Sequence, residues 1–115
     1  MASPFFLYKT MNLGNAIKHI RKQAKLSQQE MAKILDVDQS YLSMLEHNKK
    51  KPSMKLLEKI SEQTQFPLPV LFFLSLSEED VPEEKRELYR IVMPNLNNMI
   101  DQIFGTSKVE RDEAE

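Results

Sequence analysis

Polar and basic side chains suited to binding a polyanion are concentrated between residues 39 and 51. Gln39, Ser40 and Ser43 can each donate and accept hydrogen bonds, and a run of three lysines follows at 49–51. Lysines neutralise phosphates, and short polar side chains contact either phosphates or base edges. The chemistry that these residue types favour is recognition of a negatively charged polymer.

The sequence contains no pattern typical of catalysis or metal binding. It has no cysteine, which excludes disulfides and thiolate metal sites. His19 and His47 are far apart and have no carboxylates at ligand spacing. No nucleophile–base pair and no glycine-rich phosphate loop is visible. We therefore expect a protein that is not an enzyme and that uses no cofactor and no metal.

Charge is distributed unevenly along the chain, although the net charge of the 115 residues is only −1. Residues 11–60 hold ten Lys and Arg against five Asp and Glu, a net charge of +5. Residues 77–115 hold five against eleven, a net charge of −6. This asymmetry indicates a polyanion-binding front half and an acidic tail with a different role.

Composition predicts an all-α protein. Hydrophobic residues make up 41% and charged residues 29% of the chain, as in ordinary globular proteins. Two glycines are few for a sheet-rich fold, and most of the abundant residues favour helices. No apolar run approaches the roughly 20 residues that span a bilayer, so we expect no membrane association and a cytoplasmic protein. Residues 1–10 are an extension of open role, because Met11 could be an alternative start.

Hydrophobic spacing predicts three short helices in the front half, over about 13–24, 27–36 and 39–47. Ser27 and Glu30 form the pattern of a capping box at the start of the second helix. The Asp38 carboxylate is suited to cap the third helix. Asn48 is suited to end that helix in the left-handed conformation.

Two more short helices and one long helix are expected in the second half. Ser53 caps the fourth, and the fifth, over 68–74, is apolar nearly all round and should fill the core. The acidic stretch 77–84 is interpreted as a linker that places Pro82 in the first turn of the long helix. Pro94 should kink or split this helix. Its apolar stripe is Leu88, Val92, Leu96, Met99 and Ile103.

Two helices joined by a short turn, the second with polar side chains at its outward start, are the geometry of a helix-turn-helix. The segment from Leu13 to Phe73 resembles the lambda-repressor-like (Cro/repressor, XRE-type) family. The matched features are Ile20-Arg21, LSQQEMA at 26–32, SYLSMLE at 40–46, the lysine loop and Pro52. The resemblance implies a five-helix DNA-binding domain, here followed by an additional C-terminal amphipathic helix.

The chain departs from this family at Asp36, where a glycine is usual. Asp tolerates the left-handed conformation better than most residues, so the turn is still expected.

The resemblance also implies which residues contact double-stranded DNA. The base-reading positions would be Gln39, Ser40, Ser43 and Met44. Glutamine suits bidentate pairing with adenine N6 and N7, and a methionine could meet a thymine methyl. The backbone-contacting positions would be Ser27, Gln28, Tyr41, Asn48, Lys49, Lys50 and Lys51. For Tyr41, packing against the turn is an equal alternative.

Two structural roles follow from the same resemblance. Gln28 is similar to a family glutamine whose side chain braces the reading helix. Arg21 and Glu46 resemble a partly buried salt bridge that ties the first helix to the end of the reading helix.

The sequence-based prediction is therefore a DNA-binding transcriptional regulator, expected to be a repressor, that acts as a homodimer at the nucleoid. Residues 11–76 would form the DNA-binding domain and 77–115 an acidic helical extension with a frayed tail. The stripe from Leu88 to Ile103 would dimerise, unless it folds back onto its own core. The alternative function is an antitoxin or adaptor whose acidic tail engages a protein partner.

Overall fold

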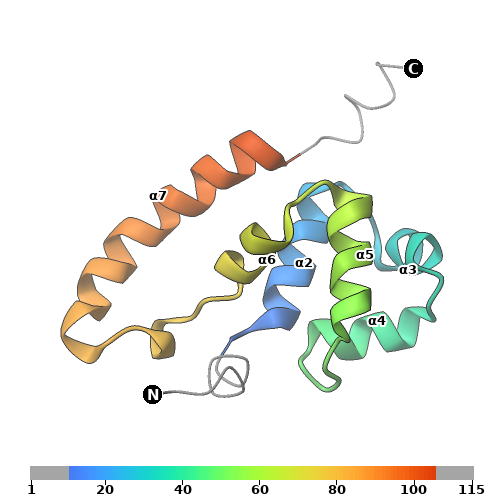
Figure 1. Cartoon of the computed structure of the whole chain (residues 1–115), viewed down its shortest axis with the longest axis horizontal. Helices are drawn as coiled ribbons and strands as arrows, with labels where there is room; N and C mark the ends of the chain where they lie inside the picture. The colour runs from blue at the N-terminus through green and yellow to red at the C-terminus, as the bar shows by residue number, and fades with distance from the viewer. Residues whose placement is uncertain (1–10, 106–115) are drawn as a thin grey trace.

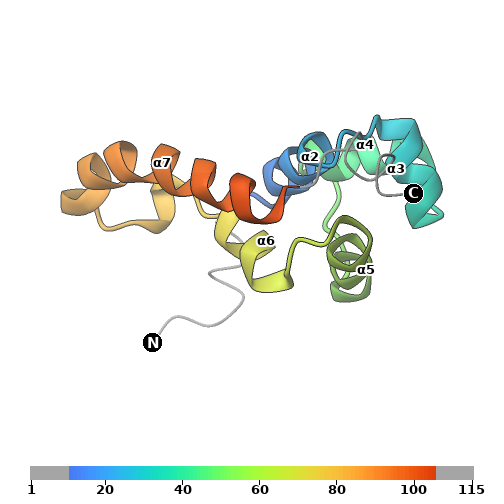
Figure 2. The same ribbon diagram turned by 90° about the horizontal axis from the view of Figure 1, so that it is seen from above.

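The computed structural model describes residues 11–105, and this part of the chain is helical with no strand (Figure 1). Its last helix is α7, which lies on the opposite side of the domain from α3 and α4 (Figure 1 and Figure 2). The fold is the expected all-α arrangement of five short helices and an added C-terminal helix. The helices are α2 (Leu13–Gln23), α3 (Gln28–Leu35), α4 (Gln39–Glu46), α5 (Met54–Thr64), α6 (Leu68–Leu74) and α7 (Arg86–Phe104), with 3₁₀ turns η1 (Glu78–Asp80) and η2 (Glu83–Lys85) before α7.

Local sequence signals set several of the helix ends. The Ser27 hydroxyl accepts from the Glu30 amide at 3.0 Å, and the Glu30 carboxylate accepts from the Ser27 amide at 2.9 Å, which confirms the capping box. Ser53 caps α5 by accepting from the Leu56 amide at 3.1 Å. Asp36 ends α3 with φ 58° and ψ 48°, so aspartate does take the left-handed conformation here.

The prediction that the Asp38 carboxylate caps α4 is wrong. Its backbone has the extended N-cap conformation, with φ −70° and ψ 145°, but its side chain makes no capping hydrogen bond. The carboxylate is exposed, and water can hydrate it as well as the amides could. The start of α4 therefore lacks a side-chain cap.

The five helices from α2 through α6 share one hydrophobic core. Its members are buried on the inward faces of the first five helices and in the segment before α6, and they include Ile17, Ile20, Met31, Leu35, Leu42, Leu45, Leu57, Ile60, Phe66 and Leu71. The expectation that α6 fills the core is only partly right. Leu71 alone is fully buried, and its apolar neighbours Leu68, Val70, Phe72 and Leu74 are half-buried against the core. The reason is that α6 lies at the edge of the domain (Figure 2).

The last helix, α7, is a single helix that contains Pro94, so the proline does not split it. Pro94 is on an exposed face, where water can satisfy the carbonyl that loses its partner. The helix also begins at Arg86 and not in the turn around Pro82, because the 3₁₀ turn η2 intervenes.

Candidate nucleic-acid interface

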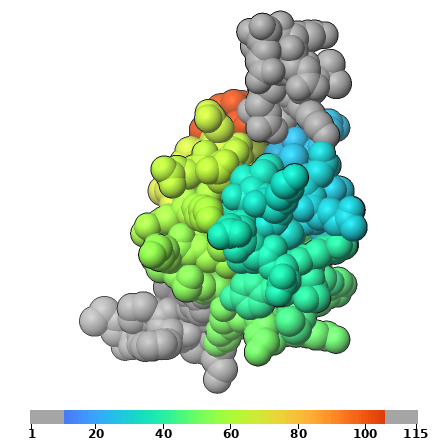
Figure 3. Space-filling model, turned by 90° about the vertical axis from the view of Figure 1, so that its right-hand side faces the viewer, coloured from blue at the N-terminus to red at the C-terminus, as the bar shows by residue number. Residues whose placement is uncertain are grey.

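The α3–turn–α4 unit displays the polar side chains that the sequence singled out. Gln39 and Ser40 are exposed at the start of α4, whereas Ser43 and Met44 are half-buried one turn later. The opposite face of α4 is fixed in the core. Figure 3 shows α3 and α4 as one continuous surface, with the segment near residue 50 adjoining it. These side chains form a face that can enter a groove while the helix itself is held rigidly.

The lysine loop extends this surface beyond the end of α4. Lys49, Lys50 and Lys51 are all exposed, and Pro52 behind them is buried. His47 ends α4, and Asn48 follows with φ 59°, the left-handed conformation expected for it. This turn places the lysines directly after the end of α4, where the Lys49 amide donates to the Met44 carbonyl at 2.8 Å, whereas Gln39 and Ser40 lie at the other end of the helix.

Arg21, Glu46 and Gln28 form a network that links α2, α3 and α4. The Arg21 guanidinium donates to Glu46 Oε2 at 2.7 Å and to Oε1 at 3.2 Å, and Gln28 Nε2 donates to the same Oε1 at 3.0 Å. The exposed fractions of the side chains of Arg21 and Glu46 are only 10% and 1%. The salt bridge and the brace that the resemblance implied are both present, and they fix the orientation of α4.

Asn48 has a structural contact that sequence reasoning missed. Its Oδ1 accepts from the Gly14 amide at 2.9 Å, and its Nδ2 donates to Asn12 Oδ1 at 2.7 Å. A Cβ atom at Gly14 would lie 2.6 Å from the carbonyl oxygens of Leu45 and Glu46, so α2 approaches the end of α4 more closely than any other residue would allow. A glycine within a predicted helix was the available signal.

Tyr41 is half-buried and packs against the core, which is one of its two expected roles. Ser27 is exposed at the start of α3, beside Gln28. A backbone contact from either Tyr41 or Ser27 stays a prediction.

Most side chains of the predicted apolar stripe of α7 are exposed to solvent. Leu88 is 58%, Met99 55% and Ile103 69% exposed, Val92 is 37% exposed, and Leu96 is half-buried. Ile91, which the stripe omitted, is 64% exposed on the same helix. Within the described chain these side chains are therefore available for a further contact.

A different set of α7 residues folds back on the domain. Ile100 and Phe104 pack against the core, and the Phe104 ring lies 6.3 Å from the Phe66 ring, centroid to centroid. Asp101, on the turn between them, contacts His19 of α2 at 2.8 and 3.0 Å. Sequence reasoning missed this second face, although the four-residue spacing of Ile100 and Phe104 was a signal for it.

Within residues 11–105 no group of His, Asp and Glu is arranged to hold a metal ion. No helix in the same part of the chain is long and apolar enough to cross a membrane.

Comparison with known proteins agrees with this geometry. A helix-turn-helix family model matches residues 17–71. The ImmF control region 10 kDa protein of Bacillus phage phi105 is 40% identical over 72 residues, which cover 63% of this chain and 77% of the relative. Control protein C.MunI of a Mycoplasma species is 38% identical over 63 residues, which cover 54% of this chain and 85% of the relative.

Among solved structures, a chain of the SinR protein/SinI protein complex matches with a TM-score of 0.51 and 31% identity over 88% of each chain. By their names, the first relative is a control-region protein and the second a control protein. The chain belongs to the XRE-type helix-turn-helix family of DNA-binding transcription regulators.

Proposed function

We propose that the protein is a repressor that binds a specific DNA sequence as a homodimer, with α4 in the major groove. The observation that carries this proposal is the rigidly braced helix α4, with exposed hydrogen-bonding side chains at its start and a loop of three exposed lysines after its end. An adaptor that had lost DNA binding would not need this combination of groups. Binding to DNA would keep the protein at the nucleoid.

Base reading is assigned to the exposed face of α4. Gln39 would pair with adenine N6 and N7, and Met44 would contact a thymine methyl. Ser40 and Ser43 would hydrogen-bond to neighbouring base edges or phosphates.

Phosphate contacts are assigned to the flanks of α4. Lys49, Lys50 and Lys51 would neutralise phosphates on one side of the groove. The start of α3, at Ser27 and Gln28, would meet the backbone on the other side. Tyr41 and Asn48 would add contacts near the ends of α4.

Dimerisation is assigned to the exposed stripe of α7, with a second copy of this chain as its occupant. Residues 91–100 contain no charged side chain, so two copies can approach there without repulsion. An apolar hollow of about 240 Å³ beside the stripe can receive an apolar side chain of the second copy, and it is lined by Val81, Lys85, Leu88, Tyr89, Val92 and Met93. Large exposed apolar residues in such a group are typical of interaction sites.

This assignment divides the chain into a DNA-binding domain at 11–76 and a dimerising extension from residue 77. Sedimentation of Leu88→Glu and Ile91→Glu variants would test it, with Glu87→Gln on the same helix as the matched control. The two apolar variants should sediment as monomers and the control as a dimer. Dimers for all three would place the interface elsewhere.

The experiment that tests the function is selection of bound sequences from a random duplex pool at physiological salt. An enriched inverted repeat, with half-sites about one helical turn apart, is the expected result for a dimeric regulator. Recovery of no motif, with only weak salt-sensitive binding, would contradict it.

A second candidate is an antitoxin or adaptor that acts through a protein partner. One observation favours it: a similar solved structure is a complex of two proteins, SinR and SinI. In that case the exposed face of α7 would bind a different chain, and the random-pool selection would recover no motif.

A further inference from the structure

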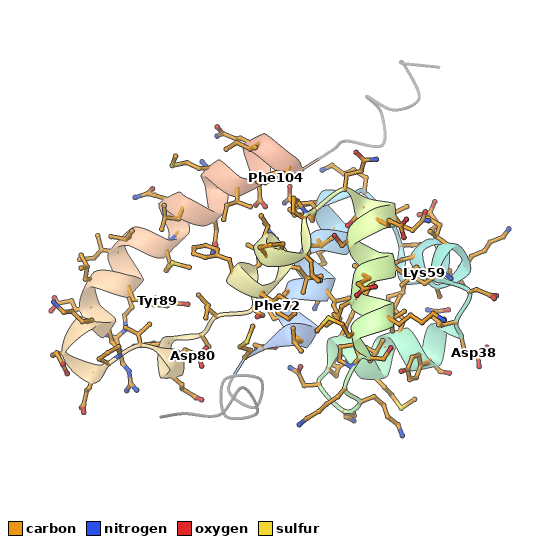
Figure 4. All side chains as sticks on the ribbon, viewed as in Figure 1. Asp38, Lys59, Phe72, Asp80, Tyr89 and Phe104 are labelled. Carbon is orange, nitrogen blue, oxygen red and sulfur yellow. The ribbon has the colours of Figure 1, made fainter. Side chains whose placement is uncertain are left out.

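The end of α7 is tied to the DNA-binding domain by contacts that lie apart from the exposed stripe of α7. We name these contacts the clasp: the His19–Asp101 pair and the Phe66–Phe104 ring contact. Figure 4 shows Phe104 at the domain end of α7 and Tyr89 in its other half, with Asp80 of η1 nearby. From the clasp we infer that His19 and Asp101 are positioning residues that set the operator spacing the repressor accepts. This inference rests on the proposed function.

The polar half of the clasp is well formed. His19 Nε2 lies 2.8 Å from Asp101 Oδ1 and 3.0 Å from Oδ2. Because a carboxylate only accepts, Nε2 is the donor to both oxygens. The side chains of His19 and Asp101 are 34% and 18% exposed, so water screens the pair less than it screens a fully exposed one. The contact joins residues 82 apart in sequence.

The apolar half lies one turn further along the helix. The Phe104 ring meets the Phe66 ring with 44° between the ring planes, and Ile100 packs on the same core. At Gly105, where the helix ends, a Cβ atom would lie 3.0 Å from Gln23 Oε1 of α2. The last turn of α7 therefore packs against both α2 and the core.

The first half of α7 is held separately. Arg86 Nε donates to the carbonyls of Glu78 and Val81 at 3.1 and 3.0 Å, and Arg90 forms an ion pair with Glu78. These contacts bind α7 to its own linker and not to the domain. Without the clasp, the linker after α6 would be the connection between the dimerising helix and α4.

The consequence concerns geometry and not affinity for a half-site. In a dimer joined through α7, the clasp fixes each α4 relative to the shared helix, so both reading helices fit only one separation of half-sites. If the clasp opens, each domain can turn about its linker, and other separations become accessible at a lower effective concentration.

The test measures binding of the full chain to inverted repeats whose spacer grows one base pair at a time over a helical turn. The wild type should bind the best spacer about 100-fold more tightly than the spacer that is half a turn out of phase, because one domain then loses its site. In His19→Glu, which places two carboxylates together, this ratio should fall to within about tenfold. Phe104→Ala should have the same effect through the other half of the clasp.

Two controls separate positioning from folding. The double variant His19→Glu with Asp101→Lys places a carboxylate opposite an ammonium group and should recover the sharp spacing optimum, whereas Asp101→Lys alone should not. Asn15→Glu adds the same negative charge as His19→Glu at an exposed position one turn earlier in α2 and should leave the optimum unchanged. Affinity for a single half-site should be equal in all variants.

A spacing optimum that is equally sharp in the wild type and in every clasp variant would overturn this inference and leave the proposed function standing. Failure of the wild type to bind any inverted repeat would overturn both.

Discussion

Arg21 of α2 and Glu46 of α4 form a bidentate ion pair that is almost completely buried, with N–O distances of 2.7 and 3.2 Å. Arg21 also donates to the Leu26 carbonyl at 2.8 Å, and Gln28 donates to the carboxylate from α3. Buried pairs add little net stability over apolar residues, but their geometry is specific. The pair holds the last turn of the reading helix against α2 and α3.

Removal of one member of this pair should lower the free energy of unfolding more than replacement of both members by apolar residues. Glu46→Ala leaves the Arg21 charge buried without its carboxylate, and we expect a loss of about 3–5 kcal/mol in the free energy of unfolding. The double variant Arg21→Met with Glu46→Leu should recover most of that loss. Urea denaturation of the three proteins measures both values. Equal losses in the single and double variants would contradict this account.

Gly14→Ala should destabilise the protein although alanine is the better helix former. The new Cβ would lie 2.6 Å from two backbone oxygens of α4, which cannot rotate away. We expect overpacking to outweigh the helix preference of about 1 kcal/mol and to leave a net loss of about 1–3 kcal/mol. Asn15→Ala, at the exposed neighbouring position, should change stability by less than about 0.5 kcal/mol. Thermal unfolding of the wild type and the two variants measures both changes in stability. Equal stability of Gly14→Ala and the wild type would contradict the prediction.

Gln39→Ala should weaken binding to the selected operator by about 1–3 kcal/mol and leave binding to random DNA nearly unchanged. The reason is that Gln39 is assigned to a base edge and not to a phosphate. Gln63→Ala, on an exposed face of α5, is the matched control and should have no effect on either DNA. Equal losses on both DNAs in Gln39→Ala would mean that this residue positions the backbone.

Lysine substitutions in the loop, unlike Gln39→Ala, should weaken binding to both kinds of DNA. Each of Lys49→Ala, Lys50→Ala and Lys51→Ala should weaken operator and random DNA alike and reduce the slope of log affinity against log salt by about one. Lys18→Ala, at an exposed position of α2, removes the same charge outside the proposed DNA contacts and the proposed dimer interface. A slope that changes as much in this control would show a general effect of net charge.

Stability should fall at alkaline pH through Tyr89. Burial, followed by the negative charges of Asp80 and Glu78, raises the pKa of its hydroxyl above the ordinary value of 10.0. The hydroxyl donates to the Leu76 carbonyl at 3.1 Å, which a phenolate cannot do. Because the folded pKa lies above the unfolded one, this stabilisation is complete below about pH 10 and is lost as pH rises through the folded pKa.

Urea unfolding midpoints measured across this range test the effect. The loss above pH 10 should be smaller in Tyr89→Phe than in the wild type. Identical pH profiles for the two proteins would rule out Tyr89 as the source.

The sequence by itself determined the all-α class, the family, the capping box at Ser27 and the polar face of α4. These features depend on residues within one or two helical turns of each other, so their spacing along the chain records them. The left-handed turns at Asp36 and Asn48 were predictable for the same reason, because they depend on the conformational preferences of single residues.

Only the tertiary structure decided which faces of α6 and α7 are covered. The sequence predicted one apolar stripe on α7, yet Ile100 and Phe104 dock on the core while Leu88 and Ile103 are exposed. Hydrophobic periodicity in the sequence shows that a helix has an apolar face, but it does not show which surface covers that face. Contacts such as Gly14 with Asn48 and His19 with Asp101 join residues 34 and 82 apart, and packing of the whole chain brings them together.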